Sequence, residues 1–314
     1  MGCGARLNGS RLTRIKLDKM PKSSQPANLP AAQEKEVIIL QPSKGWSALN
    51  LADLWRYREL AFFLTWRDIK VRYKQTMLGA LWAIIQPLLQ MIVFNFLFGN
   101  LGGIPTGDIP RPIFTFTALL PWNLFSSALS DASRSLVSNK NMITKVYFPR
   151  LLVPFSAILS GVVDFLIAFV ILLGMMVYYK FPLTSAVWAV PLFLLLAMVS
   201  ALGVGLWLSA WNLHYRDVRY MLPFVTQLWM FLTPIAYPLS EASDKLLHLL
   251  PLNLHKLYFL NPMVGVVEGF RWALLGSQQA PTEALIYAVS VSLLLLVSGM
   301  YYFRRMERTF ADMV

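Results

Sequence analysis

Four cationic side chains stand close together just before a long apolar run. They are Arg67, Lys70, Arg72 and Lys74, in the segment LTWRDIKVRYKQTMLGALWAIIQPLLQM that begins at Leu64. Arg and Lys bind phosphate oxygens readily, so this cluster could hold an anionic headgroup or a diphosphate. It could equally be a topology anchor beside a membrane, and the sequence leaves both interpretations open. We expect Asp68 to pair with Arg72 four residues on.

An amphipathic helix is predicted to present these cations. Its apolar positions recur at steps of three and four residues and are Phe62, Trp66, Ile69, Tyr73 and Met77. Arg67, Lys70 and Lys74 share the other face. A helix with an aromatic and a basic face suits the headgroup plane of a bilayer. We therefore predict an interfacial helix that turns near Leu78 and Gly79 into a membrane span.

The composition places the chain in a membrane. It has 314 residues, of which 56% are hydrophobic and only 14% are charged, which is too much apolar surface for one soluble core. A span needs roughly 20 apolar residues. Six such stretches are predicted, at 77–99, 113–137, 151–179, 187–211, 220–239 and 284–303. The predicted fold is an all-α polytopic membrane protein with both termini on one side.

The net charge of +12 follows this topology rather than a nucleic-acid face, so no nucleic-acid partner is expected. Of the 28 Lys and Arg residues, 23 lie in the N-terminal 77 residues, the two loops at 134–150 and 212–220, and the C-terminal 12 residues. The other five are Arg111, Lys180, Lys245, Lys256 and Arg271. The positive-inside rule therefore predicts cytoplasmic termini.

The sequence also predicts how the chain is divided into segments. Residues 1–36 are rich in Ser, Pro, Gly and Lys and are expected to be a disordered tail, and 37–76 a cytoplasmic cap with the interface helix. Between spans five and six, 240–283 is predicted to form short re-entrant helices, which are tolerated only where protein or a water-filled path surrounds them. Residues 77–303 form the transmembrane domain, and 304–314 a cytoplasmic tail.

Enzymatic chemistry has little support in the sequence. No Gly-x-x-x-x-Gly-Lys-Ser/Thr loop occurs, and the three histidines show no metal-ligand spacing, so neither a nucleotide cofactor nor a metal is expected in this chain. Asp164 is the one carboxylate predicted near mid-membrane, and it could be an ion or proton site. A hydrogen-bonded acid that fixes helix packing is favoured, because no second acid, Lys or His is expected at similar depth.

Aromatic residues, 13% of the chain, offer a second kind of site. Most are expected to form interfacial belts at the ends of the spans. A minority could stack on sugar rings. The candidates are Phe94, Phe98, Trp122, Trp229, Phe231 and Tyr237.

Four stretches in this order carry a resemblance to a known family. They are LWRYRELAFFLTWRDIKVRYKQTMLGALWAIIQPLLQM, LVSNKNMITKVYFPRLLVP, NLHYRDVRYMLPFVTQLWMFLTPIAYP and LNPMVGVVEGFRWALLG, spread over residues 51–276. The chain resembles the permease subunit of type-2 ABC exporters, in the branch that moves polysaccharides such as O antigen, capsule or teichoic acid. The tail of about 35 residues at the N-terminus departs from that family.

The resemblance implies a homodimer in the bacterial inner membrane, in contact with membrane lipids and joined to two copies of a cytoplasmic P-loop ATPase that binds ATP and Mg²⁺. It makes 138–149 the coupling helix that contacts this ATPase. The contact residues it implies are Asn139, Lys140, Asn141, Lys145 and Tyr147. The implied substrate is a glycan on a polyprenyl diphosphate, with its diphosphate against the basic helix and its sugars against the aromatic candidates.

Three alternatives remain at the level of sequence. A small-molecule or drug exporter of the same fold would share the topology. A secondary transporter would be expected to show inverted repeats and paired intramembrane charges, of which the sequence shows neither. A membrane glycosyltransferase or acyltransferase would need carboxylates or histidines near the interface, where Asp68 is the nearest candidate.

Overall fold

The computed structural model describes residues 55–74, 79–239, 258–276, 280–307 and 310, and these residues contain helices and no β-strand. Five helical segments are long and apolar enough to cross a membrane. They are Leu81–Leu101, Arg111–Ser138, Leu152–Tyr178, Ser185–His214 and Thr282–Glu307. The all-α polytopic prediction is therefore confirmed for the described part of the chain.

The predicted span at 220–239 is not among these five. It coincides with α9 (Val218–Phe231), a helix of 14 residues that is followed by turns up to residue 238. At 1.5 Å per residue α9 reaches about 21 Å, which is short of about 30 Å of hydrocarbon. The re-entrant segment was expected at 240–283. Its residues 240–257 lie outside the described residues, and its described part contains α12 (Pro262–Leu275).

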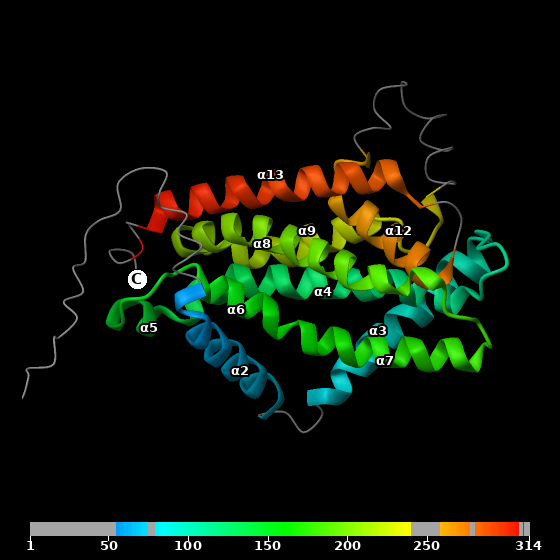
Figure 1. The fold of residues 1–314 in the computed structure, drawn as a ribbon, viewed down its shortest axis with the longest axis horizontal. Helices are drawn as coiled ribbons and strands as arrows, with labels where there is room; N and C mark the ends of the chain where they lie inside the picture. The colour runs from blue at the N-terminus through cyan, green and yellow to red at the C-terminus, as the bar shows by residue number, and fades with distance from the viewer. Residues whose placement is uncertain (1–54, 75–78, 240–257, 277–279, 308–309, 311–314) are drawn as a thin grey trace, which may run out of the picture. The chain divides into compact units, whose positions relative to one another are not determined.

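Figure 1 shows how the long helices lie alongside one another. The helices with the most extensive contacts are α4 (Arg111–Ser138), α8 (Val190–His214) and α13 (Thr282–Glu307). The third span consists of α6 (Leu152–Ser160) and α7 (Val162–Tyr178). The first span is α3 (Gly79–Phe94), which continues as the π-helix η2 (Asn95–Leu101). A short 3₁₀ turn, η3 (Ser185–Ala189), precedes α8.

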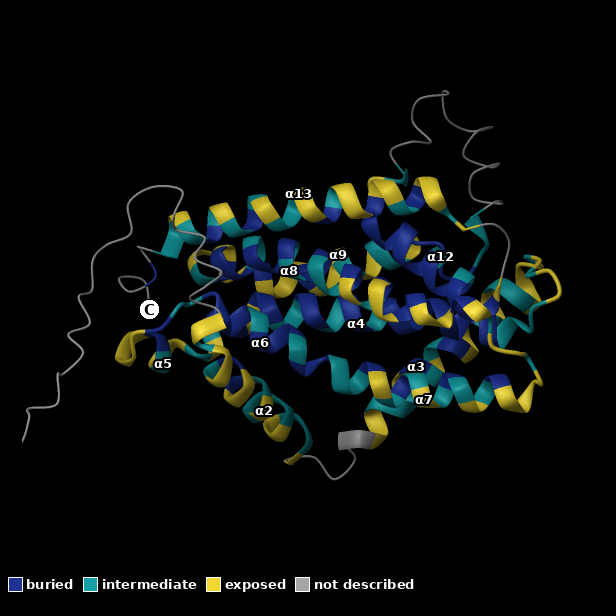
Figure 2. Cartoon of the chain, viewed as in Figure 1, coloured by how far each residue is buried: buried dark blue, intermediate teal, exposed yellow. Residues whose placement is uncertain are grey.

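Two shorter helices mark one end of this bundle. They are α2 (Arg58–Lys74), which runs obliquely and packs on α6, and α5 (Lys140–Lys145), which follows α4 (Figure 1). We call this the α5 end, and the opposite end, where α12 lies, the α12 end. The central helix of the bundle is α4, which is largely buried, whereas α13 exposes much of its surface (Figure 2). Exposed apolar side chains on α13 are what a helix facing lipid presents.

Helices α8 and α13 cross at short distance. Their backbones approach at Gly203 and Gly299, where a Cβ on Gly299 would meet the carbonyl oxygen of Gly203 and a Cβ on Gly203 would lie 2.7 Å from the backbone of Leu295. Small residues of this kind allow helices in a membrane to pack closely. A larger residue at either position would force the two helices apart.

A narrow face of α2 packs against the bundle. Ala61 and Leu64 are its buried residues, whereas Phe62 and Trp66 remain 65% and 48% exposed. The aromatic side chains therefore point away from the bundle, and a narrow stripe of small and aliphatic residues contacts α6 instead. Exposed aromatic residues beside cations are typical of a helix at a membrane interface.

A fully buried arginine organises the α12 end. Arg271 on α12 pairs through Nη1 with Oε1 of Glu268 at 2.7 Å, and the same nitrogen donates to the carbonyl of Tyr237 at 3.2 Å. Its Nη2 donates to the carbonyl of Ile235 at 2.7 Å, and the guanidinium lies 3.7 Å from the ring centroid of Phe114. One side chain thus joins α12 to α4 and to the turns that follow α9.

We expect Arg271→Met to destabilise the protein by about 3–5 kcal/mol, because it leaves the Glu268 carboxylate buried without its cation. The midpoint of thermal unfolding in detergent, followed by tryptophan fluorescence, should fall by about 10 °C. Arg304→Met is the matched control, since Arg304 pairs with Glu307 at the same i,i+3 spacing but both side chains are 20% exposed. The control should cost less than about 1 kcal/mol. Equal losses in the two variants would contradict this role of Arg271.

Candidate functional site

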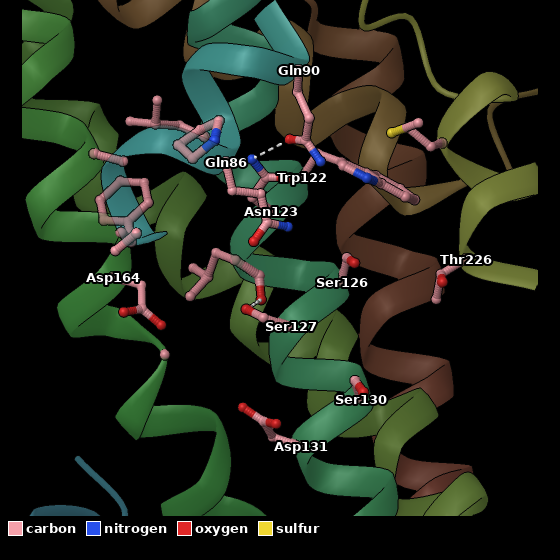
Figure 3. A pocket seen from close by; sticks show the side chains of 18 of the residues that line it. Gln86, Gln90, Trp122, Asn123, Ser126, Ser127, Ser130, Asp131, Asp164 and Thr226 are labelled. Carbon is pink, nitrogen blue, oxygen red and sulfur yellow. Dashed lines mark hydrogen bonds between the residues drawn. The ribbon is translucent and has the colours of Figure 1, made fainter. Parts of the chain in front are cut away.

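A cavity of about 730 Å³ lies between α3, α4, α7 and α9. Its lining combines amides, hydroxyls and carboxylates with a similar number of aromatic, aliphatic and other apolar residues (Figure 3). The polar lining residues are Arg72, Gln86, Gln90, Asn123, Ser126, Ser127, Ser130, Asp131, Asp164, Thr226 and Gln227. A cavity of this size, with polar groups beside the membrane-spanning helices α3, α4 and α7, is suited to a ligand that carries hydrophilic groups.

One face of α4 supplies the central wall of the cavity. Asn123, Ser126, Ser127 and Ser130 follow one another at steps of three, one and three residues, so they share one side of the helix. Nδ2 of Asn123 donates to Oε1 of Gln90 on α3 at 2.9 Å. We call these four residues of α4 the polar ladder. They were not predicted as site residues from the sequence, although polar residues at helical spacing inside a predicted span are a signal for such a face.

Several of these polar groups are available to a ligand. Within the described part of the chain, the side chains of Gln86, Ser126, Ser130 and Gln227 make no hydrogen bond to protein. An amide or hydroxyl at membrane depth gains from a partner, because hydrocarbon offers none. Water or the hydroxyl groups of a bound molecule can meet that requirement here.

Arg72 lines one end of the cavity. Its Nη2 lies 2.5 Å from Oδ2 of Asp131 on α4 and donates to Oγ of Ser160 at 3.2 Å, while its Nη1 pairs with Asp164 on α7. The hydroxyl of Tyr73 donates to the other oxygen of Asp164. Figure 3 shows Asp131 and Asp164 extending from α4 and α7 toward the same space. The guanidinium thus links α2 to three other helices.

The electrostatics of this cluster follow from its charges. Burial alone would lower the pKa of Arg72, but the carboxylates of Asp131 and Asp164 outweigh it and hold the pKa above its ordinary value. Burial, followed by the hydrogen bond to Asp164, raises the pKa of the Tyr73 hydroxyl. Arg72 therefore stays charged, Tyr73 stays a neutral donor, and the two acids share the guanidinium.

Two predictions about these charges are wrong. Asp68 pairs with its neighbour Arg67, at 2.8 Å between Oδ1 and Nη2, and not with Arg72. Asp164 was expected to lack a second acid at similar depth, yet Asp131 shares its cation. Because Arg72 pairs with Asp131 and Asp164 in the bundle, Asp68 pairs with its neighbour Arg67 on α2.

The structure separates the four basic candidates into two groups. Arg72 is directed into the bundle, whereas Lys70 and Lys74 are exposed and the side chain of Arg67 is 41% exposed. The ammonium of Lys70 lies 5.4 Å from the ring centroid of Trp66. Arg67, Lys70 and Lys74 are thus accessible to an anion outside the bundle, and Arg72 is engaged by the cavity carboxylates.

The six aromatic candidates fall into two neighbouring clusters. Phe94 stacks on Phe98 and Phe231, with ring centroids 5.6 and 6.3 Å apart, and the hydroxyl of Tyr237 donates to the carbonyl of Phe231 at 3.2 Å. Trp122 and Trp229 both contact Phe125, with ring centroids 5.6 and 5.0 Å from that of Phe125. The candidates therefore lie together, as a shared role would require.

Only one of the six, Trp122, lines the cavity. Phe94 is buried, Phe231 is 50% exposed, and Nε1 of Trp229 donates to Oδ1 of Asn261 at 2.9 Å. Most of these rings thus contribute to packing beside the cavity, and the polar face of α4 forms more of its lining. Whether any ring contacts sugar stays a prediction.

The predicted coupling segment contains a short helix, α5, with exposed polar residues and a buried apolar side. Ile143 in α5 and Phe148 after it are buried in a hydrophobic cluster with Phe303 and Phe310. The exposed members are Lys140, Asn141, Lys145 and Tyr147. Asn139 differs from them, because its Nδ2 donates to the carbonyl of Ser135 at 2.9 Å and so ties α5 to the end of α4.

Comparison with known proteins connects this architecture to one family. The sequence model of the family described as ABC-2 type transporter matches residues 59–275. The O-antigen export system permease protein RfbA of Myxococcus xanthus is 30% identical over 264 residues, which cover 83% of this chain and 98% of that protein. RfbA of Klebsiella pneumoniae is 29% identical, over 82% and 95%. The polysialic acid transport protein KpsM of Escherichia coli is 27% identical, over 79% and 92%.

Proposed function

This chain belongs to the ABC-2 type transporter family, and on that premise we propose that it is the permease subunit of an ATP-driven polysaccharide exporter. Its cargo is a glycan such as O antigen, linked to a polyprenyl diphosphate and moved across the bacterial inner membrane. The names of the relatives support the class of cargo. The observation that carries the proposal is the cavity lined by amides and hydroxyls beside the membrane-spanning helices.

The chemistry of the cavity fits a sugar chain. A polysaccharide presents many hydroxyl groups, each of which loses hydrogen bonds to water when it enters hydrocarbon. The face of α4, with Gln86 and Gln90 on α3, offers amide and hydroxyl groups that replace those bonds. Trp122, the aromatic candidate that lines the cavity, supplies apolar surface beside them for the face of a sugar ring.

The topology in this proposal has six spans with both termini in the cytoplasm. The fifth span is α9 together with the turns that follow it to residue 239, and α12 belongs to a re-entrant segment on the outer side. The α5 end is then cytoplasmic, in agreement with the distribution of Lys and Arg. A second copy of the chain completes the translocation path.

ATP hydrolysis belongs to a separate subunit, present in two copies. The sequence contains no P-loop, so this chain cannot bind ATP in that manner. The exposed side of α5 and Tyr147 form the surface for the ATPase, while Ile143 and Phe148 anchor that surface in the core. Arg67, Lys70 and Lys74 form the surface for the diphosphate, because their charges are accessible from outside the bundle.

A small-molecule exporter of the same family is the second candidate. The cavity volume of about 730 Å³ falls within the range of ordinary ligand pockets, which is the observation in its favour. The two candidates differ in whether a lipid-linked glycan stimulates ATP hydrolysis by the complex.

We predict that the tagged chain, extracted from its native membrane in mild detergent, carries a P-loop ATPase in about equal amount. Lys140→Glu combined with Lys145→Glu should abolish this co-purification and transport without unfolding the chain, because it reverses the charge of the α5 surface. Lys180→Glu, an exposed reversal at the other end of the bundle, is the control and should retain the ATPase. Recovery of the unaltered chain alone would contradict the proposed function, and retention of the ATPase by the double variant would contradict the coupling surface.

We also predict that Arg67→Ala combined with Lys70→Ala weakens stimulation of ATP hydrolysis by lipid-linked glycan. Loss of charge-assisted hydrogen bonds to a phosphate should raise the half-stimulating concentration about tenfold or more. Arg216→Ala with Arg219→Ala removes two exposed cations at the start of α9 and should leave stimulation unchanged. If both double variants respond to the glycan like the parent, the two residues on α2 are topology anchors.

A further inference from the structure

The two arginines that organise this chain differ in how firmly they are held. Arg271 is 1% exposed and its partner Glu268 is 14% exposed, so that pair is sealed from water. Arg72, Asp131 and Asp164 are 28%, 36% and 29% exposed. Partly exposed ion pairs contribute less net stability than is lost when a sealed network loses one partner. The contacts of Arg72 can therefore open without unfolding the bundle.

The charge balance of the cluster also makes Arg72 exchangeable. Asp131 and Asp164 share its guanidinium, and the charge of Arg134 on α4 also acts on Asp131. A phosphate group offers the same planar pairing to Arg as a carboxylate does. An anion of higher charge beside α2 can therefore compete with Asp131 and Asp164 for the guanidinium.

The packing of α2 shows which part would move when these contacts open. Its buried residues, Ala61 and Leu64, both lie in the first half of the helix and contact α6. In the second half, Arg72 and Tyr73 carry the hydrogen bonds to α4, α6 and α7. Loss of those bonds would free the second half while the first half stays docked.

The contacts lie at the boundary of the cavity. Asp131 follows the last serine of the polar ladder on α4, and Asp164 lies in the first turn of α7, directly after the break between α6 and α7 at Gly161. Arg72, Asp131 and Asp164 all line the cavity. When Arg72 bridges the two acids, its side chain forms part of the cavity wall beside the second half of α2.

We propose that Arg72, Asp131 and Asp164 form a releasable latch between the cavity and the second half of α2, and that the two aspartates are positioning residues for transport. This inference rests on the proposed function in one respect, namely that a diphosphate on the substrate is the anion that draws Arg72 away. Arg72 then holds the cavity closed before loading and contacts phosphate only after the latch opens.

A single-cysteine reporter can test the latch in the full-length chain. Cys3 is the only cysteine, so Cys3→Ser gives a background into which Ser130→Cys, beside Asp131 in the cavity, can be introduced. The rate at which a neutral, water-soluble maleimide modifies this position in membrane vesicles reports access to the cavity. Lys145→Cys on the exposed surface of α5 is the reference position.

Arg72→Gln and Asp164→Asn should each raise the rate at Ser130→Cys about tenfold or more, because each removes a charge-assisted contact. The rate at Lys145→Cys should stay constant. Arg67→Gln is the matched control, since its partner Asp68 lies on the same helix and ties no second element. The exchange variant Arg72→Asp with Asp164→Arg should restore slow modification, which a misfolded protein would not do. Equal rates in all variants, or an exchange variant as fast as the single ones, would overturn the latch.

A second arm separates this inference from the proposed function. Polyprenyl diphosphate in the vesicles should accelerate modification of the parent reporter and leave Arg72→Gln unchanged. Fast modification in the latch variants without any response to polyprenyl diphosphate would support the latch and contradict the diphosphate-linked cargo. Stimulation of ATP hydrolysis by lipid-linked glycan, with equal modification rates in every variant, would support the cargo and overturn the latch.

Discussion

The constraint on which this structure depends is that a charge near hydrocarbon needs a partner. Two arginines satisfy it in opposite ways. Arg271 is sealed between Glu268, two backbone carbonyls and the face of Phe114, and so fixes the α12 end. Arg72 bridges two aspartates that water reaches. Removal of a partner from the first arrangement strongly lowers the stability of the protein, whereas the contacts of the second are partly exposed and contribute less to stability.

Helix α4 connects the parts of the molecule that the proposed function uses. Its polar face lines the cavity, its Asp131 holds Arg72, and its C-terminal end is tied to α5 through Asn139 and Ser135. Asn212 on α8 also donates to the carbonyl of Ser133 at 2.9 Å. A displacement of α5 by an ATPase would therefore reach the cavity through one continuous, buried helix.

The cavity divides its chemistry between two kinds of residue. Amides and hydroxyls on α3, α4 and α9 form most of the polar lining, while the aromatic candidates pack mainly behind and beside it. In the proposed function, the hydrogen-bonding groups replace the hydration of a sugar, and the rings keep the helices that carry those groups in place. A lining of this kind is tolerant, since hydroxyls and amides can donate or accept.

The sequence by itself determined the helical class and five spans, because these follow from the length of apolar runs. It could not determine the partners of Arg72, since Asp131 and Asp164 lie 59 and 92 residues further along the chain. Nor did it reveal the polar wall of α4 or the short α9. Tertiary structure decided these features, because the helix that a polar side chain faces depends on packing between helices, whereas the span itself depends on the hydrophobicity of its own residues.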